Sequence, residues 1–318
     1  MELPLALREA MEQQLYGMQH EQMIHDAQAL SLRYRTQGGR SERLLNGEHE
    51  SCAYAVSRMP ATHGAVFSCL QQVLDAAGNL PETLLDAGAG TGAASWAADS
   101  LLELKSITCL ERETAMTKTG KAMMEKGSEV LRLAKWIQKD LVQDEICEHA
   151  DLVIAAYVLN EMTAWDRLIA AEKLWNAAGQ ILLLVEPGTP VGFSGLMEAR
   201  KHLLQKGAYI IAPCPLYHDC PKPEDDWCHF SCRIARSRLH RQMKGGEAPF
   251  EDEKFCYLAL SRQEGSPANA RVLRHPQIHS GHVTLEVCTS GGIQSIGLSK
   301  KDGDSYRKAR KVKAGDSF

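Results

Sequence analysis

The sequence has no long apolar segment and no recognisable targeting segment at its start. A helix that spans a bilayer needs at least about 18 consecutive apolar residues, and the 318 residues contain no such run. The first residues include Glu2, Glu9 and Glu12, which fits neither a secretory signal nor an acid-poor transit peptide. We therefore expect a cytoplasmic protein with no membrane association, and we expect a monomer.

The sequence also lacks a large excess of charge of one sign. Its formal net charge is −4, which argues against general affinity for nucleic acid. Basic residues are nevertheless concentrated in two stretches: residues 231–244 hold five Lys or Arg and no acid, and residues 300–313 hold seven Lys or Arg against two Asp. Each stretch could be a solvated face or could contact an anionic partner such as RNA. We expect residues 231–244 to form a basic helix.

Hydrophobic patterning divides the chain into three parts. Residues 1–80 have the apolar spacing of helices, with an interruption expected at Pro60, because proline disfavours the helical conformation in the residue before it. Residues 81–207 alternate short apolar strands with helices, and residues 208–318 form a Cys-rich and basic extension. The alternation predicts an α/β fold whose doubly wound, mainly parallel sheet has helices on both faces.

A glycine-rich turn follows the first of the expected strands. Gly88, Gly90 and Gly92 lie between this strand and an Ala-rich helix. Glycine is needed where a turn is tight and the backbone must approach a ligand closely. Asp86 lies two residues before the first glycine, the usual place for an acid in sites for S-adenosylmethionine (SAM). The turn therefore predicts a SAM-binding site at this strand–helix junction.

Two further acids follow the next two expected strands. Glu111 ends the second strand, where a carboxylate can bind both ribose hydroxyls of a nucleotide. Asp140 follows the third strand, where an acid commonly contacts the adenine amino group. An NAD site uses the same strand, glycine turn and acid, and a structural turn without ligand is a further alternative. The acid within the motif and its Gly-Thr-Gly ending favour SAM.

Half of the ten cysteines fall within 43 residues of the C-terminal part. Three have the spacing Cys214-x5-Cys220-x7-Cys228, and a fourth ligand could come from Cys232 or Cys256. Four thiolates suit zinc or an iron–sulfur cluster, and buried thiols without metal are the alternative. The spacing is not that of zinc ribbons, so it does not decide the metal. A mixed zinc site stays open because of two nearby histidines, His218 and His229.

Several motifs in combination resemble the mitochondrial small-ribosomal-subunit methyltransferase-like family, which has bacterial relatives. The resemblance covers roughly residues 25–315. It rests on the glycine turn and on the segments Arg58-Met59-Pro60-Ala61-Thr62, Leu159-Asn160-Glu161-Met162, Val185-Glu186-Pro187-Gly188-Thr189, Asp219-Cys220-Pro221, Asp226-Trp227-Cys228-His229-Phe230 and Phe255-Cys256-Tyr257.

The resemblance implies a class I SAM-dependent methyltransferase (Rossmann-like) fold and a role in small-subunit assembly and translation. Organellar members of the family are similar in holding a [4Fe–4S] cluster with four cysteines. Carried over to this sequence, these would be Cys214, Cys220, Cys228 and Cys256, and Cys232 would be a bystander or an alternative ligand. The resemblance therefore favours an iron–sulfur cluster over zinc.

The methyl-acceptor side of the site is less well defined by the sequence. Amino-directed methyltransferases often carry Asn/Asp-Pro-Pro-aromatic after the fourth strand, where this chain has Leu159-Asn160-Glu161-Met162. Asn160 could orient a base edge and Glu161 could accept a proton, or both could cap the following helix. Two functions therefore stay open: a SAM-dependent methyltransferase acting on small-subunit rRNA, or a catalytically idle assembly factor that binds rRNA through a basic region stabilised by metal.

Overall fold

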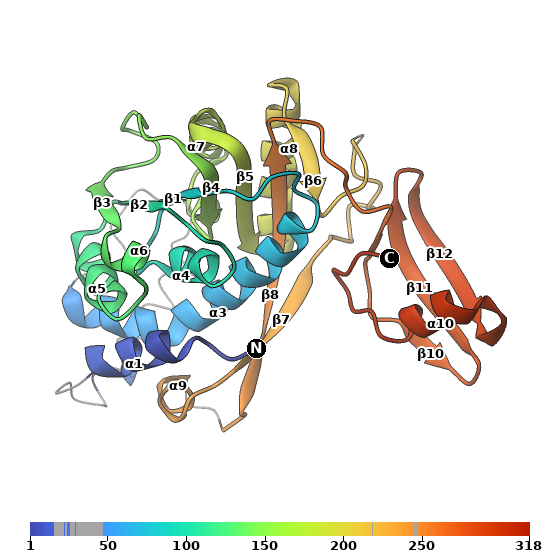
Figure 1. Ribbon diagram of the computed structural model, residues 1–318, viewed down its shortest axis with the longest axis horizontal. Coiled ribbons are helices and arrows are strands. Elements are labelled where there is room, and N and C mark those ends of the chain that lie inside the picture. Colours follow the sequence, from blue (N-terminus) through green and yellow to red (C-terminus); the bar gives the residue numbers. More distant parts are fainter. Residues whose placement is uncertain (16–21, 23, 26–28, 30–46, 218, 245–246) are drawn as a thin grey trace.

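The computed structural model describes residues 1–15, 22, 24, 25, 29, 47–217, 219–244 and 247–318. Most of the expected helical segment between residues 16 and 46 lies outside this set, as does His218. The described part contains a large α/β layer structure and a smaller C-terminal sheet at its side (Figure 1).

The main sheet has eight strands in the order β3-β2-β1-β4-β5-β8-β6, with β7 beside β8. Strands β1 to β5 are parallel, and β8 is antiparallel to β5, β6 and β7. The strand bounds are β1 Thr83–Ala87, β2 Ser106–Glu111, β3 Lys135–Gln138, β4 Ala150–Ala156, β5 Ala178–Pro187, β6 Tyr209–Ala212, β7 Phe230–Ala235 and β8 Phe250–Ser261.

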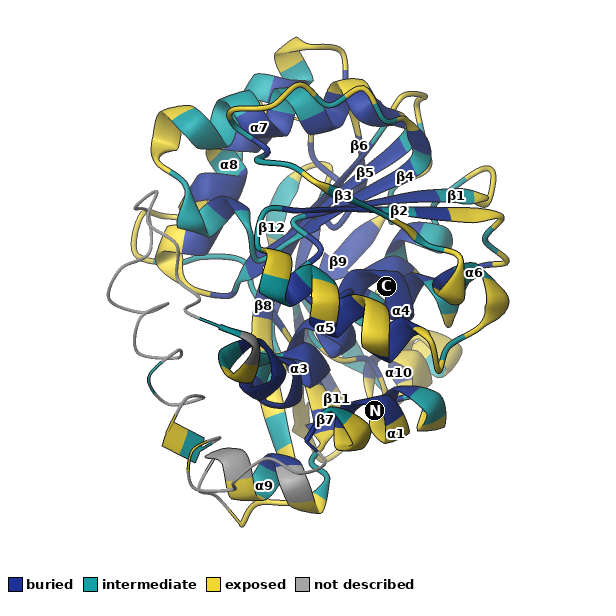
Figure 2. Cartoon of the chain, turned by 90° about the vertical axis from the view of Figure 1, so that its left-hand side faces the viewer, coloured by how far each residue is buried: buried dark blue, intermediate teal, exposed yellow. Residues whose placement is uncertain are grey.

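Helices cover both faces of this sheet (Figures 1 and 2). One apolar core lies between the sheet and α3, α4 and α5, and a second lies between the sheet and α7 and α8. Because both faces are covered, the central strands are almost continuously apolar, as the sequence indicates. The helix bounds are α1 Leu5–Gln14, α3 Glu48–Leu74, α4 Ala93–Asp99, α5 Thr114–Met124, α6 Glu129–Arg132, η1 Leu159–Glu161, α7 Ala164–Ala177 and α8 Pro190–Gln205.

The topology creates a ligand crevice between β1 and β4. The chain runs outward from β1 through β2 to β3 on one side, and from β4 to β5 on the other. In open α/β sheets, ligands bind at the carboxyl ends of the strands where the order reverses in this way. The strand order, the antiparallel β8 and the helices on both faces agree with the expected Rossmann-like fold of class I SAM methyltransferases.

The boundary expected at residue 207 does not separate two structural units. Strands β6 and β8, which come after it, complete the main sheet. A second, four-stranded sheet forms only from residue 270 onward, with its own apolar core under α10. Its elements are β9 Ala270–Val272, β10 Gln277–His279, β11 His282–Thr289, β12 Gly292–Ser299, η2 Lys300–Asp302 and α10 Gly303–Ala309.

Two local expectations are corrected by the structure. Helix α3 continues through Pro60 without a break, because its buried residues on both sides pack into the core and offset the one hydrogen bond that proline removes. Residues 231–244 are not one basic helix. Their first part is strand β7, in which Phe230, Cys232 and Ile234 alternate inward with exposed neighbours, and only Arg238–Lys244 forms a helix, α9.

Candidate SAM site and cysteine cavity

The glycine turn lies at the carboxyl end of β1, in the crevice described above. Gly88, Gly90 and Gly92 have φ values of +68°, +56° and +88°, in the left-handed region that favours glycine. A Cβ on Gly88 would approach Val158 of the loop after β4 to 2.7 Å, whereas a Cβ on Gly90 would project into open space. The turn therefore packs closely on one side and leaves its backbone accessible on the other.

Asp86 supports the turn from within the protein. Its side chain is 2% exposed and accepts hydrogen bonds from Ser95 N (3.0 Å) and Ser95 Oγ (2.7 Å). Burial raises the pKa of Asp86 to about 6, although both hydrogen bonds lower it. The structure thus places Asp86 as a residue that holds the start of α4 against β1.

Glu111 lies directly beside the turn, as the sequence predicts. Its Oε2 accepts a hydrogen bond from Gly90 N (2.7 Å), and its Oε1 accepts one from Glu113 N (2.7 Å). Burial raises the pKa of this carboxyl, which these two bonds oppose. The buried acid and the accessible backbone of Gly90 therefore form one small site.

Asp140 lies farther out, after β3. Its Oδ1 accepts hydrogen bonds from Val142 N (2.8 Å) and Gln143 N (3.0 Å), which close a turn. Its Oδ2 lies 3.5 Å from Arg112 Nη1, and Arg112 follows Glu111 in the chain. Although burial raises the pKa of Asp140, the two backbone bonds and Arg112 hold it below its ordinary value. Asp140 is thus ionised at the rim of the crevice.

The loop after β4 carries both predicted catalytic residues, but they face different surroundings. With its amide nitrogen turned toward Glu186, Asn160 donates to Glu186 Oε2 (3.1 Å) and to Tyr157 O (2.9 Å). Glu186 also accepts the backbone N–H groups of Leu159 (2.9 Å) and Asn160 (3.2 Å). Asn160 therefore fixes the loop to the end of β5.

Glu161 is the more reactive of the two side chains. The pKa of Glu161 is raised to about 8. Burial is the main cause, the charge of Glu111 also raises it, and Arg112 lowers it. Glu161 therefore lies close enough to Glu111 and Arg112 for their charges to interact. A carboxyl with a pKa near neutrality is suited to proton transfer or to binding a cation.

Three residues that the sequence analysis did not predict as site residues form a network beside this loop. Tyr157 has φ = 61°, an uncommon conformation for a residue other than glycine. Its hydroxyl donates to Glu253 Oε1 (2.9 Å), and Arg58 donates to both oxygens of Glu253 (3.2 and 3.4 Å). The guanidinium of Arg58 also lies over the Tyr157 ring. The positive φ was not visible in the sequence, and Glu253 reaches this place only because β8 continues past the sheet to pair with β7.

Four cysteines line one small cavity between the main sheet and the C-terminal sheet. They are Cys214, Cys220, Cys228 and Cys288, and Arg271 and Lys222 line the same cavity. The pKa of the Cys214 thiol is raised to about 12, mainly by burial. Cys220 and Cys288 also raise it, whereas Arg200 and Arg271 lower it. The mutual effects of these thiols agree with their position around one space.

The structure does not bring the other two predicted candidates to this cavity. Cys256 lies in the second core, and its Sγ is 3.2 Å from the carbonyl oxygen of Pro187. Cys232 lies in the first core on β7, against Gly64 of α3. Successive strand residues point to opposite faces, so Cys256 and Tyr257 of the same motif diverge. The sequence analysis did not group Cys288 with the other cysteines because Cys288 lies outside the cysteine-rich stretch. Val283, Leu285 and Val287 alternate into the core of the C-terminal sheet, and this pattern could have indicated that Cys288 faces away from that core.

The cysteine cavity is not a preformed metal site. Within the described ranges, no group of three or more His, Cys, Asp or Glu side chains is arranged to hold a metal ion. The cavity measures about 20 Å³, so binding a metal there would require the loop of residues 213–228 to adjust. The chemistry of the lining, four thiols beside buried cations, nevertheless suits an anionic metal–thiolate group.

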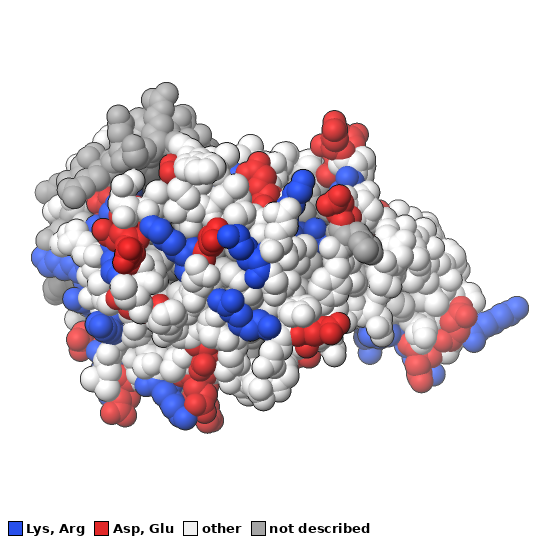
Figure 3. Space-filling view, turned by 90° about the horizontal axis from the view of Figure 1, so that it is seen from above, with Lys and Arg blue, Asp and Glu red and all other residues white. Residues whose placement is uncertain are grey.

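The two basic stretches differ in how much free charge they present. Arg233 and Arg236 form ion pairs of 2.7 Å with Asp252 and Glu251 of β8. On the face shown in Figure 3, acidic and basic side chains are interspersed. By contrast, the basic residues of the C-terminal stretch are all exposed: Lys300, Lys301, Arg307, Lys308, Arg310, Lys311 and Lys313.

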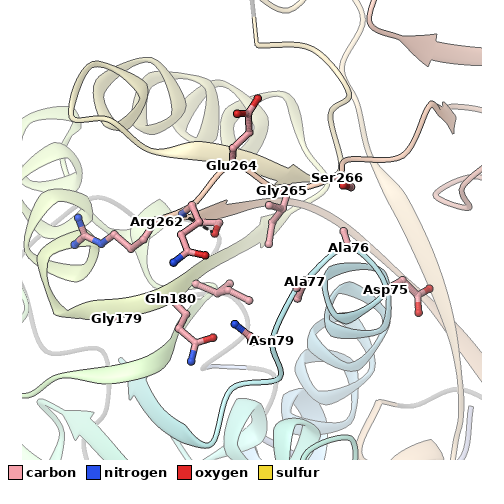
Figure 4. Close-up of a pocket in the computed structure, with 15 residues that line it drawn as sticks. Asp75, Ala76, Ala77, Asn79, Gly179, Gln180, Arg262, Glu264, Gly265 and Ser266 are labelled. Carbon is pink, nitrogen blue, oxygen red and sulfur yellow. Dashed lines mark hydrogen bonds between the residues drawn. The ribbon is translucent and has the colours of Figure 1, made fainter.

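A larger cavity, of about 500 Å³, opens at the opposite edge of the sheet, near the start of β1 and β5 (Figure 4). Its lining mixes small and polar residues such as Asn79, Gln180 and Glu264. Its one arginine, Arg262, donates to the carbonyl oxygens of Trp175 and Ala178 and stacks on the Trp175 ring. These contacts use the charged group for structure, so the candidate sites remain the crevice and the cysteine cavity.

Comparison with curated proteins gives relatives from mitochondria. The human protein named "Ribosome assembly protein METTL17, mitochondrial" is 29% identical over 261 residues, which cover 74% of this chain and 55% of that protein. "Rsm22-cox11 tandem protein 2, mitochondrial" of Schizosaccharomyces pombe is 27% identical over 215 residues, covering 52% of this chain and 29% of that protein. The chain thus spans about half or less of the length of these relatives. Their names give no support to the expectation of a cytoplasmic protein.

Similar solved structures include proteins named as methyltransferases, and their sequence identity to this chain is low. The N-methyltransferase NodS from Bradyrhizobium japonicum is 11% identical with a TM-score of 0.45, covering 75% of this chain and 99% of that one. A putative RNA methyltransferase from Pyrococcus horikoshii is 14% identical with a TM-score of 0.41, covering 74% and 96%.

The described helices include none that is long and apolar enough to cross a membrane. The family model "Mitochondrial small ribosomal subunit Rsm22" matches residues 48–318. This range contains the crevice, the cysteine cavity and the exposed basic stretch. Because the match extends over most of the chain, the protein belongs to the Rsm22 family.

Proposed function

We propose that this protein binds SAM at the carboxyl ends of β1, β2 and β4 and acts on or with small-subunit ribosomal RNA during ribosome assembly. Membership of the Rsm22 family supports the ribosomal role. The ligand assignment rests on one observation above all: the open space over Gly90 lies beside the buried carboxylate of Glu111. A backbone without a Cβ next to such an acid suits a nucleoside whose ribose reaches the carboxylate.

Each residue of the crevice has a distinct part in this proposal. Gly88 and Gly90 would lie against the ligand, Glu111 would accept hydrogen bonds from the ribose hydroxyls, and Asp140 would contact the adenine amino group. SAM supplies a methyl group on a sulfonium cation. Glu161, whose charge interacts with that of Glu111, would add negative charge near that cation when it is ionised.

Methyl transfer itself requires an acceptor held in line with the methyl group at near-attack distance. The amide nitrogen of Asn160 donates to Glu186 and to the backbone of Tyr157, so this side chain is fixed to the end of β5. The segment also departs from the Asn/Asp-Pro-Pro-aromatic pattern of amino-directed methyltransferases, which favours a second candidate function, a SAM-binding assembly factor without turnover. In that case the network of Arg58, Tyr157 and Glu253 serves to hold the loop after β4 in one conformation.

The exposed basic stretch of residues 300–313 is the proposed RNA contact. Its seven Lys and Arg residues face solvent on η2, α10 and the following turn, where they can approach phosphates without first breaking buried ion pairs. Residues 231–244 contribute less, because Arg233 and Arg236 are paired with acids of β8.

We further propose that Cys214, Cys220, Cys228 and Cys288 hold a [4Fe–4S] cluster, with zinc as the alternative. Such a group would provide a cross-link between the loop after β6 and strand β11 of the C-terminal sheet. Support comes from the shared cavity and from the buried cations beside it. Anaerobically purified protein should then be brown and contain roughly four irons per chain, whereas one zinc and no colour would contradict the cluster.

Calorimetry with SAM, followed by tritiated methyl transfer to small-subunit rRNA, tests the main proposal. Loss of binding in Glu111→Ala, with the thermal stability of that same variant unchanged as the control for folding, supports the crevice as the SAM site. Transfer to rRNA or an assembly intermediate identifies an enzyme, and binding without transfer identifies the idle factor. Absence of SAM binding would contradict both.

A further inference from the structure

Arg271 on β9 is a buried cation without a carboxylate partner among the described residues. Its side chain is only 2% exposed. It donates to the carbonyl oxygens of Pro213 (3.0 Å) and Gly315 (2.8 Å), to Ser317 Oγ (3.3 Å) and to Gln72 Oε1. All four acceptors are neutral. A buried charge that meets only neutral groups is costly unless an anion lies nearby.

Two other cations near the cavity, Lys222 and Arg274, contrast with Arg271. Lys222 is almost as buried, but its Nζ pairs with Asp226 and with Glu286 (3.2 Å). Arg274, two residues after the end of β9, pairs with Asp226 at the surface. The neutral contacts of Arg271 explain how its donors are satisfied, but they do not explain why this position carries a positive charge.

The position of Arg271 indicates where the missing anion would lie. In the antiparallel pair of β9 and β11, Arg271 is directly opposite Cys288, and cross-strand partners point to the same face of a sheet. Both residues line the cavity that also contains Cys214, Cys220 and Cys228. Thiolates that bind a metal in this cavity would therefore form beside the guanidinium.

A second polar group near the cavity also lacks a partner. The hydroxyl of Tyr257 is buried and makes no hydrogen bond to any described residue. Burial is the main cause that raises its pKa, and the charges of Arg271, Cys69, Cys214 and Cys228 also act on it. A buried hydroxyl without a partner is uncommon and calls for an explanation. A sulfur of a metal–thiolate group would accept its hydrogen.

We propose that Arg271 and Tyr257 set the reduction potential of the cluster held by the four cysteines. This inference rests on the cluster of the proposed function. Reduction adds one electron, and the reduced form carries one more negative charge. A positive charge and a hydrogen-bond donor beside the sulfurs stabilise that form and raise the potential, since net charge and hydrogen bonds to sulfur are main determinants of it. Neither residue would be a ligand of the cluster. Arg271 would act on its potential through a positive charge, and Tyr257 through a hydrogen-bond donor.

The test is a redox titration of the full chain with dithionite under anaerobic conditions, followed by visible absorbance and electron paramagnetic resonance. Arg271→Gln should lower the reduction potential of the cluster. At a fixed ambient potential, the ratio of oxidised to reduced cluster should then rise at least tenfold, which corresponds to about 59 mV for one electron. Tyr257→Phe should lower the potential by a smaller amount. Arg271→Lys and the surface control Arg274→Gln should keep the wild-type value.

The outcomes separate this inference from the cluster on which it rests. A loaded Arg271→Gln variant with the wild-type potential would overturn the inference and leave the cluster intact. If Arg271→Gln does not fold or does not take up the cluster, the test rests on Tyr257→Phe, because this change removes one oxygen and keeps the packing. An unchanged reduction potential in Tyr257→Phe would then overturn the inference. Wild-type protein that contains zinc, or no metal, overturns the cluster and the inference together.

Discussion

The protonation of Glu161 should make SAM binding depend on pH. With its pKa at about 8, roughly one molecule in ten carries an ionised Glu161 at pH 7 and about half do at pH 8. The sulfonium of SAM favours the ionised form, so its affinity should rise as pH increases from 6 to 8 and level off above that. If only the ionised form binds, the rise is at most roughly fifty-fold. Calorimetry at each pH measures it, with proton release expected on binding at pH 7.

The product S-adenosylhomocysteine is the matched control, because it is a neutral thioether with the same adenosine and amino-acid parts. Its affinity should change much less over the same range. Glu161→Gln should remove the difference between the two ligands' pH profiles, while Glu111 and Glu113, which also raise the pKa of Glu161, remain in place. Parallel pH profiles of the two ligands in the wild-type protein would refute the assignment of Glu161 to the sulfonium.

Two further predictions concern the support of the glycine turn and the contact with RNA. Ser95→Ala removes a hydroxyl that donates to buried Asp86, so the free energy of unfolding in urea at pH 7 should fall by about 1–3 kcal/mol; an unchanged value would contradict the structural role of Asp86. In filter binding, Lys308→Gln with Lys311→Gln should weaken affinity for small-subunit rRNA and reduce its salt dependence. Arg233→Gln should leave both unchanged, and equal losses in the two variants would contradict the assignment of the RNA contact to the C-terminal stretch.

The sequence predicts the fold class and the arrangement of the glycine turn well because both depend on local patterns. Alternating apolar strands and helices specify a parallel sheet covered on both faces, and the glycines at positive φ follow from the tight turn. Glu111 is predictable for the same reason, since the end of β2 must lie beside the end of β1 in a parallel sheet.

The remaining features depend on contacts between distant segments. Strand β8 follows the cysteine-rich loop in the chain and yet joins the main sheet. Its register with β7 places Arg233 opposite Asp252. Local residue spacing predicts neither the position of β8 nor this ion pair. For the same reason, the sequence alone groups Cys256 with the neighbouring cysteines, whereas the fold brings Cys288 of the C-terminal sheet to them. The left-handed conformation of Tyr157 likewise arises from tertiary packing.

The most direct test of the account compares Cys288→Ser with Cys256→Ser, each purified anaerobically beside the wild-type protein. Iron content and visible absorbance are measured per chain. If the cysteine cavity holds the cluster, Cys288→Ser should lose most of the iron and the colour, and Cys256→Ser should keep roughly four irons per chain. Loss of iron in Cys256→Ser with full retention in Cys288→Ser would contradict the assignment of the cluster to this cavity.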